Sequence, residues 1–169
     1  MLIFNYVYPI PLWQQGNTWY KKLFGGWQLS GVTTIEGGLP INLGISSDIA
    51  GVGTASRQRP NLVGDWTINS HTPASWFNTA AFANPAPGTW GTLGKYGLRG
   101  PGMNNWDLSL YKSEKLKERL SLQIRAEVYN APNHLSYSSV GTTLGTATFG
   151  QVTGAADPRI VQFGMKLVF

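Results

Sequence analysis

Apolar and polar side chains alternate strictly between residues 120 and 129. The even positions hold Leu120, Leu122, Ile124, Ala126 and Val128, and the odd positions hold Ser121, Gln123, Arg125, Glu127 and Tyr129. Successive side chains of an extended chain point to opposite faces, so an alternation with period two is typical of a β-strand. This segment is therefore predicted to be a strand with one apolar face and one polar face.

The same alternation recurs in four other segments, 2–10, 27–43, 106–111 and 161–169. The composition agrees, because charged residues make up only 12% of the chain, against about 25% in soluble domains. Seven Trp, seven Tyr and seven Phe accompany 21 Gly, which suits strands joined by turns. The sequence predicts an all-β fold of five antiparallel strands and predicts no helix.

The connections between these strands differ sharply in length. Residues 13–25 and 112–119 form compact links, whereas 45–104 and 132–158 are long and lack sustained periodicity. Short and long links alternate along the chain, so an antiparallel sheet would have its short links at one end and its long links at the other. This asymmetry is typical of outer-membrane β-barrels. We therefore expect residues 1–169 to form a single all-β unit of barrel strands, with a polar lumen face and an apolar lipid face.

A soluble β-sandwich is the alternative fold. An antiparallel sheet with one face on a protein core and the other in water shows the same alternation. In that case the chain would stand alone and would bind or hydrolyse carbohydrate. The periodicity fits both folds, and the polarity of the connections favours the barrel.

Several function classes receive no support from the residues present. The 13 basic residues behind the net charge of +5 are scattered, which gives no basic patch for nucleic acid. Cysteine is absent, which excludes disulfides and thiolate metal sites. His71 and His134 lie far apart in the sequence without a ligand spacing, and we expect no metal site and no cofactor.

Glycoside hydrolysis would need two carboxylates facing each other across a cleft. Three carboxylates, Glu36, Asp107 and Glu127, fall on the polar face of predicted strands and are the candidates if the chain is an enzyme. Arg125 beside that face would pair with them, and we expect this structural role. The sequence therefore predicts no catalytic activity.

Aromatic residues gather in the long link 45–104. The candidates for ligand binding are Trp66, Trp76, Phe77, Trp90 and Tyr96. Aromatic faces stack on sugar rings, and neighbouring amides hydrogen-bond the sugar hydroxyls. The alternative is a loop that packs on itself, so that its aromatic residues bury one another.

Several short motifs, taken in their order, resemble one family. They are Arg59–Asp65, Trp76–Phe82, Leu98–Gly102, Asn105–Leu110, Gln123–Glu127, Asn130–His134, Phe149–Gly150, Asp157–Arg159 and Gln162–Phe169. Their order and spacing are similar to the C-terminal part of TonB-dependent outer-membrane receptors. The nearest resemblance is to the Oar-like group, whose N-terminal domain is carboxypeptidase-regulatory-like.

The resemblance implies a transporter barrel of about 22 strands in the outer membrane, to which this chain contributes the last strands. The parent protein would take up a substrate such as a glycan or a siderophore. The implied partners are outer-membrane lipid and the barrel-assembly machinery, and the terminal Phe169 resembles the signal that this machinery reads. Energy coupling through TonB would act only through an N-terminal part that these residues do not include.

Overall fold

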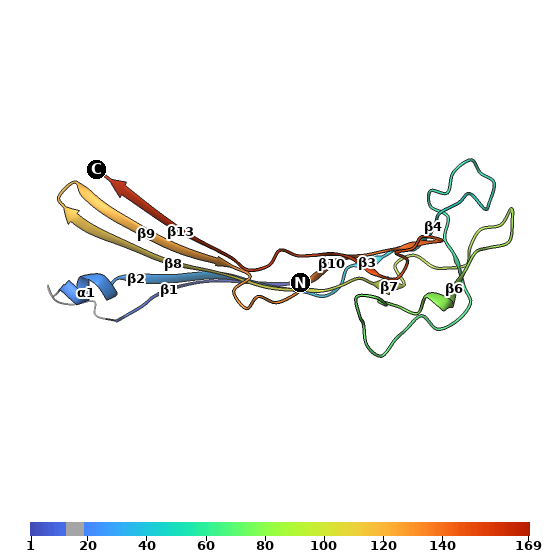
Figure 1. Ribbon diagram of the computed structural model, residues 1–169, viewed down its shortest axis with the longest axis horizontal. Helices are drawn as coiled ribbons and strands as arrows, with labels where there is room; N and C mark the ends of the chain where they lie inside the picture. Colours follow the sequence, from blue (N-terminus) through green and yellow to red (C-terminus); the bar gives the residue numbers. More distant parts are fainter. Residues whose placement is uncertain (13–18) are drawn as a thin grey trace. The chain divides into compact units, whose positions relative to one another are not determined.

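The computed structural model describes residues 1–12 and 19–169, and the chain divides into two compact units (Figure 1). Unit 1 comprises Met1–Glu36, Asn104–Leu135 and Asp157–Phe169, and unit 2 comprises Gly37–Met103 and Ser136–Ala156. Unit 2 therefore consists mainly of the two long links between the predicted strands.

Unit 1 is built on an open five-stranded sheet. Its strands, in spatial order, are β1 (Leu2–Pro9), β2 (Trp27–Glu36), β8 (Met103–Lys117), β9 (Leu120–Tyr129) and β13 (Ile160–Val168). The pairs β1–β2, β8–β9 and β9–β13 are antiparallel. The predicted all-β fold with antiparallel strands is confirmed, and β1 and β13 form the two edges of the sheet.

The strand register gathers apolar side chains on one face of this sheet. In the β9–β13 pair, Val161, Phe163, Met165 and Leu167 lie opposite Val128, Ala126, Ile124 and Leu122. On the other face, Gln162 lies opposite Glu127 and Lys166 lies opposite Gln123. Because side chains alternate along each strand, a slip of one residue would exchange the two faces. The register thus keeps the apolar positions of neighbouring strands together.

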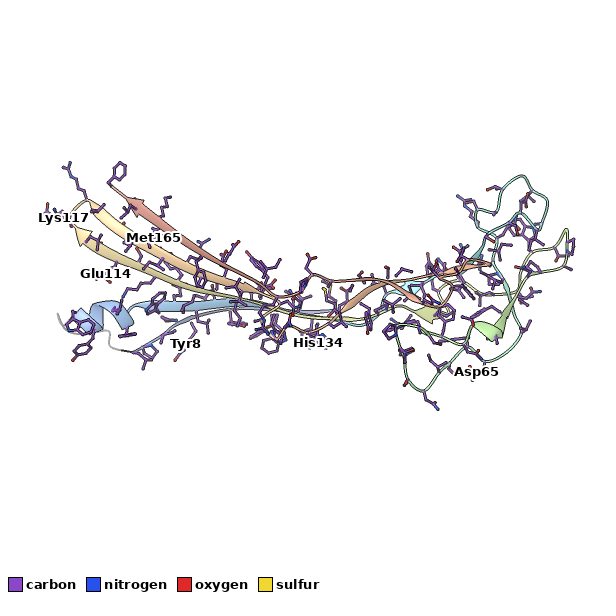
Figure 2. All side chains as sticks on the ribbon, in the orientation of Figure 1. Tyr8, Asp65, Glu114, Lys117, His134 and Met165 are labelled. Carbon is purple, nitrogen blue, oxygen red and sulfur yellow. The ribbon has the colours of Figure 1, made fainter. Side chains whose placement is uncertain are left out.

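The apolar face of the sheet is left uncovered. Phe163 and Met165 on β13 are 82% and 74% exposed, and Met165 is labelled in Figure 2. The buried apolar side chains among the described residues all belong to unit 2. A β-sandwich requires a second layer over this face. Residues 1–12 and 19–169 supply none, so the structure does not support the sandwich alternative.

The short connections lie at one end of the sheet (Figure 1). Residues 118–119 join β8 to β9, and helix α1 (Trp19–Phe24) lies in the link between β1 and β2. Lys112, in the second half of β8, donates hydrogen bonds to the carbonyl oxygens of Leu23 and Gly25. Both links therefore lie at the same end. The long links leave the sheet after β2 and after β9, at its opposite end, as their alternation predicts.

Two predictions for the short links are corrected. The charged segment 112–119, predicted to be a turn, extends β8 as far as Lys117, because its residues continue to pair with β9. The link 13–25, predicted without a helix, contains α1, and Gly26 after the helix adopts a φ of +72°. Residues 13–18 of this link lie outside the described residues. No helix among the described residues is long and apolar enough to cross a membrane.

The second predicted strand, 27–43, is also shorter than expected, since β2 ends at Glu36. Two glycines follow directly. A Cβ atom on Gly38 would lie only 1.8 Å from the carbonyl oxygen of Gly100, so the close approach of these backbones requires glycine. The chain therefore leaves the sheet at this point and enters unit 2.

Unit 2 consists of short two-stranded sheets and loops. The pairs are β3 (Pro40–Ile41) with β7 (Leu98–Arg99), β4 (Gly44–Ile45) with β11 (Thr143–Leu144), β5 (Asn61–Leu62) with β6 (Phe82–Ala83), and β10 (Tyr137–Val140) with β12 (Val152–Ala155). A 3-10 helix, η1 (Thr79–Ala81), follows Asn78, whose side chain accepts a hydrogen bond from the Ala80 amide. The β4–β11 pair joins the first long link to the second.

Apolar side chains from both long links form the core of unit 2. Its buried members are Leu43, Phe77, Ala81, Phe82, Leu93, Leu98 and Val140. The rings of Phe77, Phe82 and Phe149 contact one another edge to face, with centroid separations of 5.3 to 5.9 Å. Edge-to-face contacts add to the stabilisation from apolar burial. The two links therefore fold together around one core.

Candidate ligand-binding site

A cavity of about 750 Å³ opens in unit 2. Its walls are formed by residues 42–44, 55–59, 90–91, 95–96 and 142–143, so both long links contribute to it. Cavities of roughly 300–1,000 Å³ hold small-molecule ligands in proteins. This cavity is therefore the candidate ligand-binding site.

The side chain of Gln58 fixes one wall of the cavity and is only 2% exposed. Its Oε1 accepts hydrogen bonds from the amides of Ile49 and Ala50, at 3.1 and 3.0 Å. Its Nε2 donates to the carbonyl oxygen of Thr54 at 2.6 Å and to the carboxylate of Asp48. Because both ends of the buried amide are bonded, the loop around it is held in one conformation.

The carboxylate of Asp48 closes the turn that precedes this wall. It accepts hydrogen bonds from the amides of Val52 and Gly53, at 3.1 and 2.6 Å. The hydrogen bond from Gln58 is the main reason that the pKa of the Asp48 carboxyl lies below its usual value, and the two amides act in the same direction. Asp48 is thus ionised at neutral pH, and the fold of the turn depends on that charge.

A second wall of the cavity is set by a close backbone approach. A Cβ atom on Gly91 would lie 1.8 Å from the carbonyl oxygen of Arg59, so a residue with a side chain does not fit there. The guanidinium of Arg59 donates from Nη1 to the carbonyl oxygen of Leu93 at 2.9 Å. These contacts hold the segment that carries Trp90 against the segment that carries Arg59.

Two residues of the cavity wall have a left-handed backbone. Arg57 has a φ of +69° and Tyr96 a φ of +58°. The amide of Tyr96 donates a hydrogen bond to Oδ1 of Asn42 at 3.0 Å. Residues other than glycine adopt this conformation at an energetic cost, and such residues are found preferentially at functional sites. The strain at two wall positions supports the assignment of this cavity as a binding site.

The five predicted ligand-binding aromatic residues do not lie together. Trp90 and Tyr96 line the cavity. Phe77 is buried in the core of unit 2, and Trp66 and Trp76 pack against that core. The sequence could not separate these two groups, because both have the same composition and lie in the same link. Packing in three dimensions decides which rings remain accessible.

Three cationic residues of the cavity were not predicted from the sequence. Arg57, Arg59 and Lys95 all line it, and no Asp or Glu does so. Within the described part of the chain, none of the three forms an ion pair. Arg57 and Arg59 lie two residues apart, and Lys95 comes from a distant segment of the same long link, so no basic run in the sequence marks the three together. The cavity therefore combines positive charge with two accessible aromatic rings.

The polar face of unit 1 has a shallower hollow of about 280 Å³. Asp107 and Glu127 line it, and Glu36 does not. Glu127 forms an ion pair with Arg125 at 3.4 Å and accepts a hydrogen bond from Gln162. The structure thus brings two of the three predicted carboxylates to one hollow, with Glu127 bonded to side chains on its own strand and on β13.

Asp107 supports a turn at the end of β9. Its Oδ1 accepts hydrogen bonds from Nδ2 of Asn105 at 2.9 Å and from the amide of Asn130 at 3.0 Å. Asn130 has a φ of +50°, and its Nδ2 donates to the carbonyl oxygens of His134 and Asp157. Asparagine tolerates the left-handed backbone better than most residues. The Asn130–His134 motif therefore has a structural role where the second long link begins.

A buried lysine lies, together with Glu114, on the face of the sheet that carries the apolar side chains of β9. Lys112 pairs in register with Ile124 and is 3% exposed. Its Nζ donates to the carbonyl oxygens of Leu23 at 3.3 Å and Gly25 at 2.6 Å, and it forms an ion pair with Glu114 at 3.5 Å. Carbonyl groups at the end of a helix lack partners within the helix. Lys112 bonds the carbonyl oxygen of Leu23 in α1 and that of Gly25 directly after it, and so fixes the helix against β8.

The histidines and Phe169 are not among the residues that line the cavity. The His71 ring stacks on Trp76, and its Nδ1 lies 2.6 Å from the carbonyl oxygen of that residue. His134 belongs to unit 1 and is labelled in Figure 2. Over residues 1–12 and 19–169, no three His, Asp or Glu side chains gather as a metal site requires. Phe169 follows β13 at the end of the chain and is fully accessible.

A comparison with protein families identifies the architecture. The model of one family, described as an outer membrane beta barrel domain, matches residues 1–162. No curated protein and no solved structure gives a significant match. The uncovered apolar face, the polar opposite face and the separation of short from long links agree with this family, which implies an outer-membrane location. The chain therefore belongs to the outer membrane beta barrel domain family.

Proposed function

We propose that the chain forms the last strands and two external loops of a TonB-dependent transporter, which takes up a substrate such as a glycan or a siderophore. One observation carries the proposal: the two long links fold into one unit that contains a cavity of about 750 Å³. Outer-membrane barrels have long loops on the external side and short turns on the periplasmic side. On this proposal, a cavity built from the long loops would receive a ligand from outside the cell.

The exposed apolar face of the sheet supports a contact with outer-membrane lipid. Phe163, Met165 and Leu167 on β13 are all exposed. The bilayer interior offers no hydrogen bonds to the backbone, so the edges β1 and β13 need partner strands within it. Because single-chain barrels have at least about 8 strands, we propose that further strands close the barrel.

Two other partners belong to this proposal. The barrel-assembly machinery would recognise Phe169 at the end of the apolar alternation on β13. The energy-coupling protein TonB would act through an N-terminal plug and coupling segment. Neither the cavity nor the polar face of the sheet is assigned a catalytic role.

The test is uptake by cells that produce the complete protein, with and without their TonB-type coupling protein. Fluorescent maltohexaose, fluorescent hexagalacturonate and a ferric catecholate siderophore serve as probes. We expect at least one probe to bind at the surface in both strains and to accumulate only when the coupling protein is present. Equal accumulation of every bound probe in both strains would identify a passive pore and overturn the proposal.

A further inference from the structure

We propose that the cavity of unit 2 binds an acidic oligosaccharide, a glycan whose rings carry carboxylate or sulfate groups. The inference rests on the proposed uptake function and names the class of its substrate. It is carried by three cations and two accessible aromatic rings that line the same cavity.

The charge of the cavity favours an anion. Arg57, Arg59 and Lys95 line it, whereas no carboxylate does. Asp48, the acidic residue behind the Gln58 wall, uses both carboxylate oxygens for hydrogen bonds within its own loop. Several cationic side chains in a concave site attract anions and bind them through charge-assisted hydrogen bonds. The planar guanidinium group matches carboxylate and sulfate oxygens especially well.

The other lining groups favour a sugar over a small inorganic anion. Trp90 and Tyr96 are 58% and 60% exposed, although the aromatic residues of the nearby core are buried. Their rings offer apolar faces on which sugar rings stack. The lining also includes Ser56, Thr142 and Thr143, and hydroxyl groups both donate hydrogen bonds to sugar hydroxyls and accept from them.

The walls are held by contacts within the loops themselves. The buried amide of Gln58 holds one wall, and the close approach of Gly91 to Arg59 holds the other. Binding to a preformed site avoids the entropic cost of ordering its loops. These contacts therefore keep the cations and rings together on one cavity.

Binding is measured by isothermal titration calorimetry on the complete protein, purified from outer membranes in detergent. The acidic probes are hexagalacturonate, hexamannuronate and a chondroitin sulfate hexasaccharide. Maltohexaose is the neutral probe, and ferric tris-catecholate is an anionic aromatic probe without sugar rings. We expect at least one acidic oligosaccharide to bind more than tenfold more tightly than maltohexaose. Its affinity should fall as NaCl is raised from about 50 mM to about 500 mM, because salt screens the charges.

Variants assign the binding to this cavity. Arg57→Gln and Lys95→Gln should each weaken binding of the acidic oligosaccharide by about tenfold, the effect of one charge-assisted hydrogen bond. Trp90→Ala should weaken it through the loss of stacking. Arg99→Gln is the matched control, since Arg99 is an exposed cation of unit 2 that does not line the cavity. It should leave the affinity unchanged.

Three results would overturn the inference. They are no preference for any acidic oligosaccharide over maltohexaose, equal losses in Arg57→Gln and Arg99→Gln, and tight binding of ferric tris-catecholate alone. The assay needs no energy coupling, so its outcome is independent of the uptake test. Acidic-glycan binding without TonB-dependent accumulation would contradict the proposed transporter, whereas TonB-dependent accumulation of another probe would contradict only the ligand class.

Discussion

The side-chain amide of Gln58 donates a hydrogen bond to the carboxylate of Asp48, ten residues earlier in the chain. The bond joins the buried group that shapes a wall of the cavity to the group that closes the preceding turn. Asp48 in turn accepts from the amides of Val52 and Gly53. The two residues therefore stabilise the loop 48–58 together, through one hydrogen-bond network.

Replacing Gln58 with Leu removes the hydrogen bonds of this side chain and retains a similar side-chain volume. The amide of Ala50 loses its partner, at a cost of about 1–3 kcal/mol for an unsatisfied group, whereas the amide of Ile49 keeps the carbonyl oxygen of Ser47. We expect limited proteolysis to cut the loop 48–58 faster than in the parent protein. Gln151→Leu, at an exposed position of the same unit, is the control and should retain the parent cleavage rate. Equal resistance of both variants would show that Gln58 does not order the loop.

Asp48 gives this loop a pH dependence at the acid end. The pKa of its carboxyl lies below the ordinary value of 3.8, so folding favours the ionised form. The resulting stabilisation is present above the ordinary value and is lost as the pH falls through the lowered pKa. Hydrogen exchange of the Val52 and Gly53 amides, corrected for intrinsic rates, should stay slow from about pH 7 to about pH 5 and accelerate below about pH 4. Asp48→Asn should remove this step, and an unchanged step in the variant would assign it to another group.

The two faces of β13 should respond differently to the same charge. Met165→Lys places a charge on the apolar face, with an expected cost of about 2–4 kcal/mol if that position lies near the bilayer midplane. Gln162→Lys places it on the polar face opposite Glu127 and should cost much less. The free energy of unfolding of the complete protein in lipid vesicles, measured by urea titration, distinguishes them. Equal losses would contradict the assignment of the apolar face to lipid.

The last residue should matter for membrane assembly more than for stability. Phe169 lies beyond β13 and is 97% exposed, so its side chain contributes little to packing within the chain. We expect deletion of Phe169 to reduce the amount of protein in the outer-membrane fraction, and Phe169→Tyr to preserve it. Immunoblots of fractionated cells supply the measurement. Equal insertion of the deletion variant and the parent would reject the role of Phe169 as an assembly signal.

Lys112 should stabilise unit 1 through α1. Lys112→Met removes the donor to the carbonyl oxygen of the buried residue Gly25, at a cost of about 1–3 kcal/mol, whereas the carbonyl oxygen of Leu23 keeps the hydrogen bond from Nε1 of Trp27. Lys115→Met removes an exposed lysine of the same strand and serves as the control. Urea unfolding in detergent should show a lower midpoint for Lys112→Met alone.

The strands could be predicted from the sequence because a pattern of period two depends only on neighbouring residues. The same parity placed Asp107 and Glu127 on the polar face, and both line its hollow. The last residue of each strand could not be predicted from this pattern. Lys117 continues β8, since charged residues fit a strand whose backbone remains paired, whereas the glycines after Glu36 end β2.

The binding cavity could be predicted only in part. Trp90 and Trp66 have the same chemistry and lie in the same link, but one lines the cavity and the other packs against the core. Arg57 and Lys95 come together only through contacts between distant segments. Long-range packing of this kind leaves no periodic trace in the sequence, so composition identified the link but not the site within it.

The contact between Phe77 and Phe149 joins two parts of the chain that are far apart in the sequence. The β8–β9 hairpin lies between these two residues in the chain. The core of unit 2 therefore cannot be completed until the hairpin and the segment after it have been synthesised. Contacts between residues so distant in sequence form slowly. The core of unit 2 is therefore completed late in folding, after the residues up to Phe149 are available.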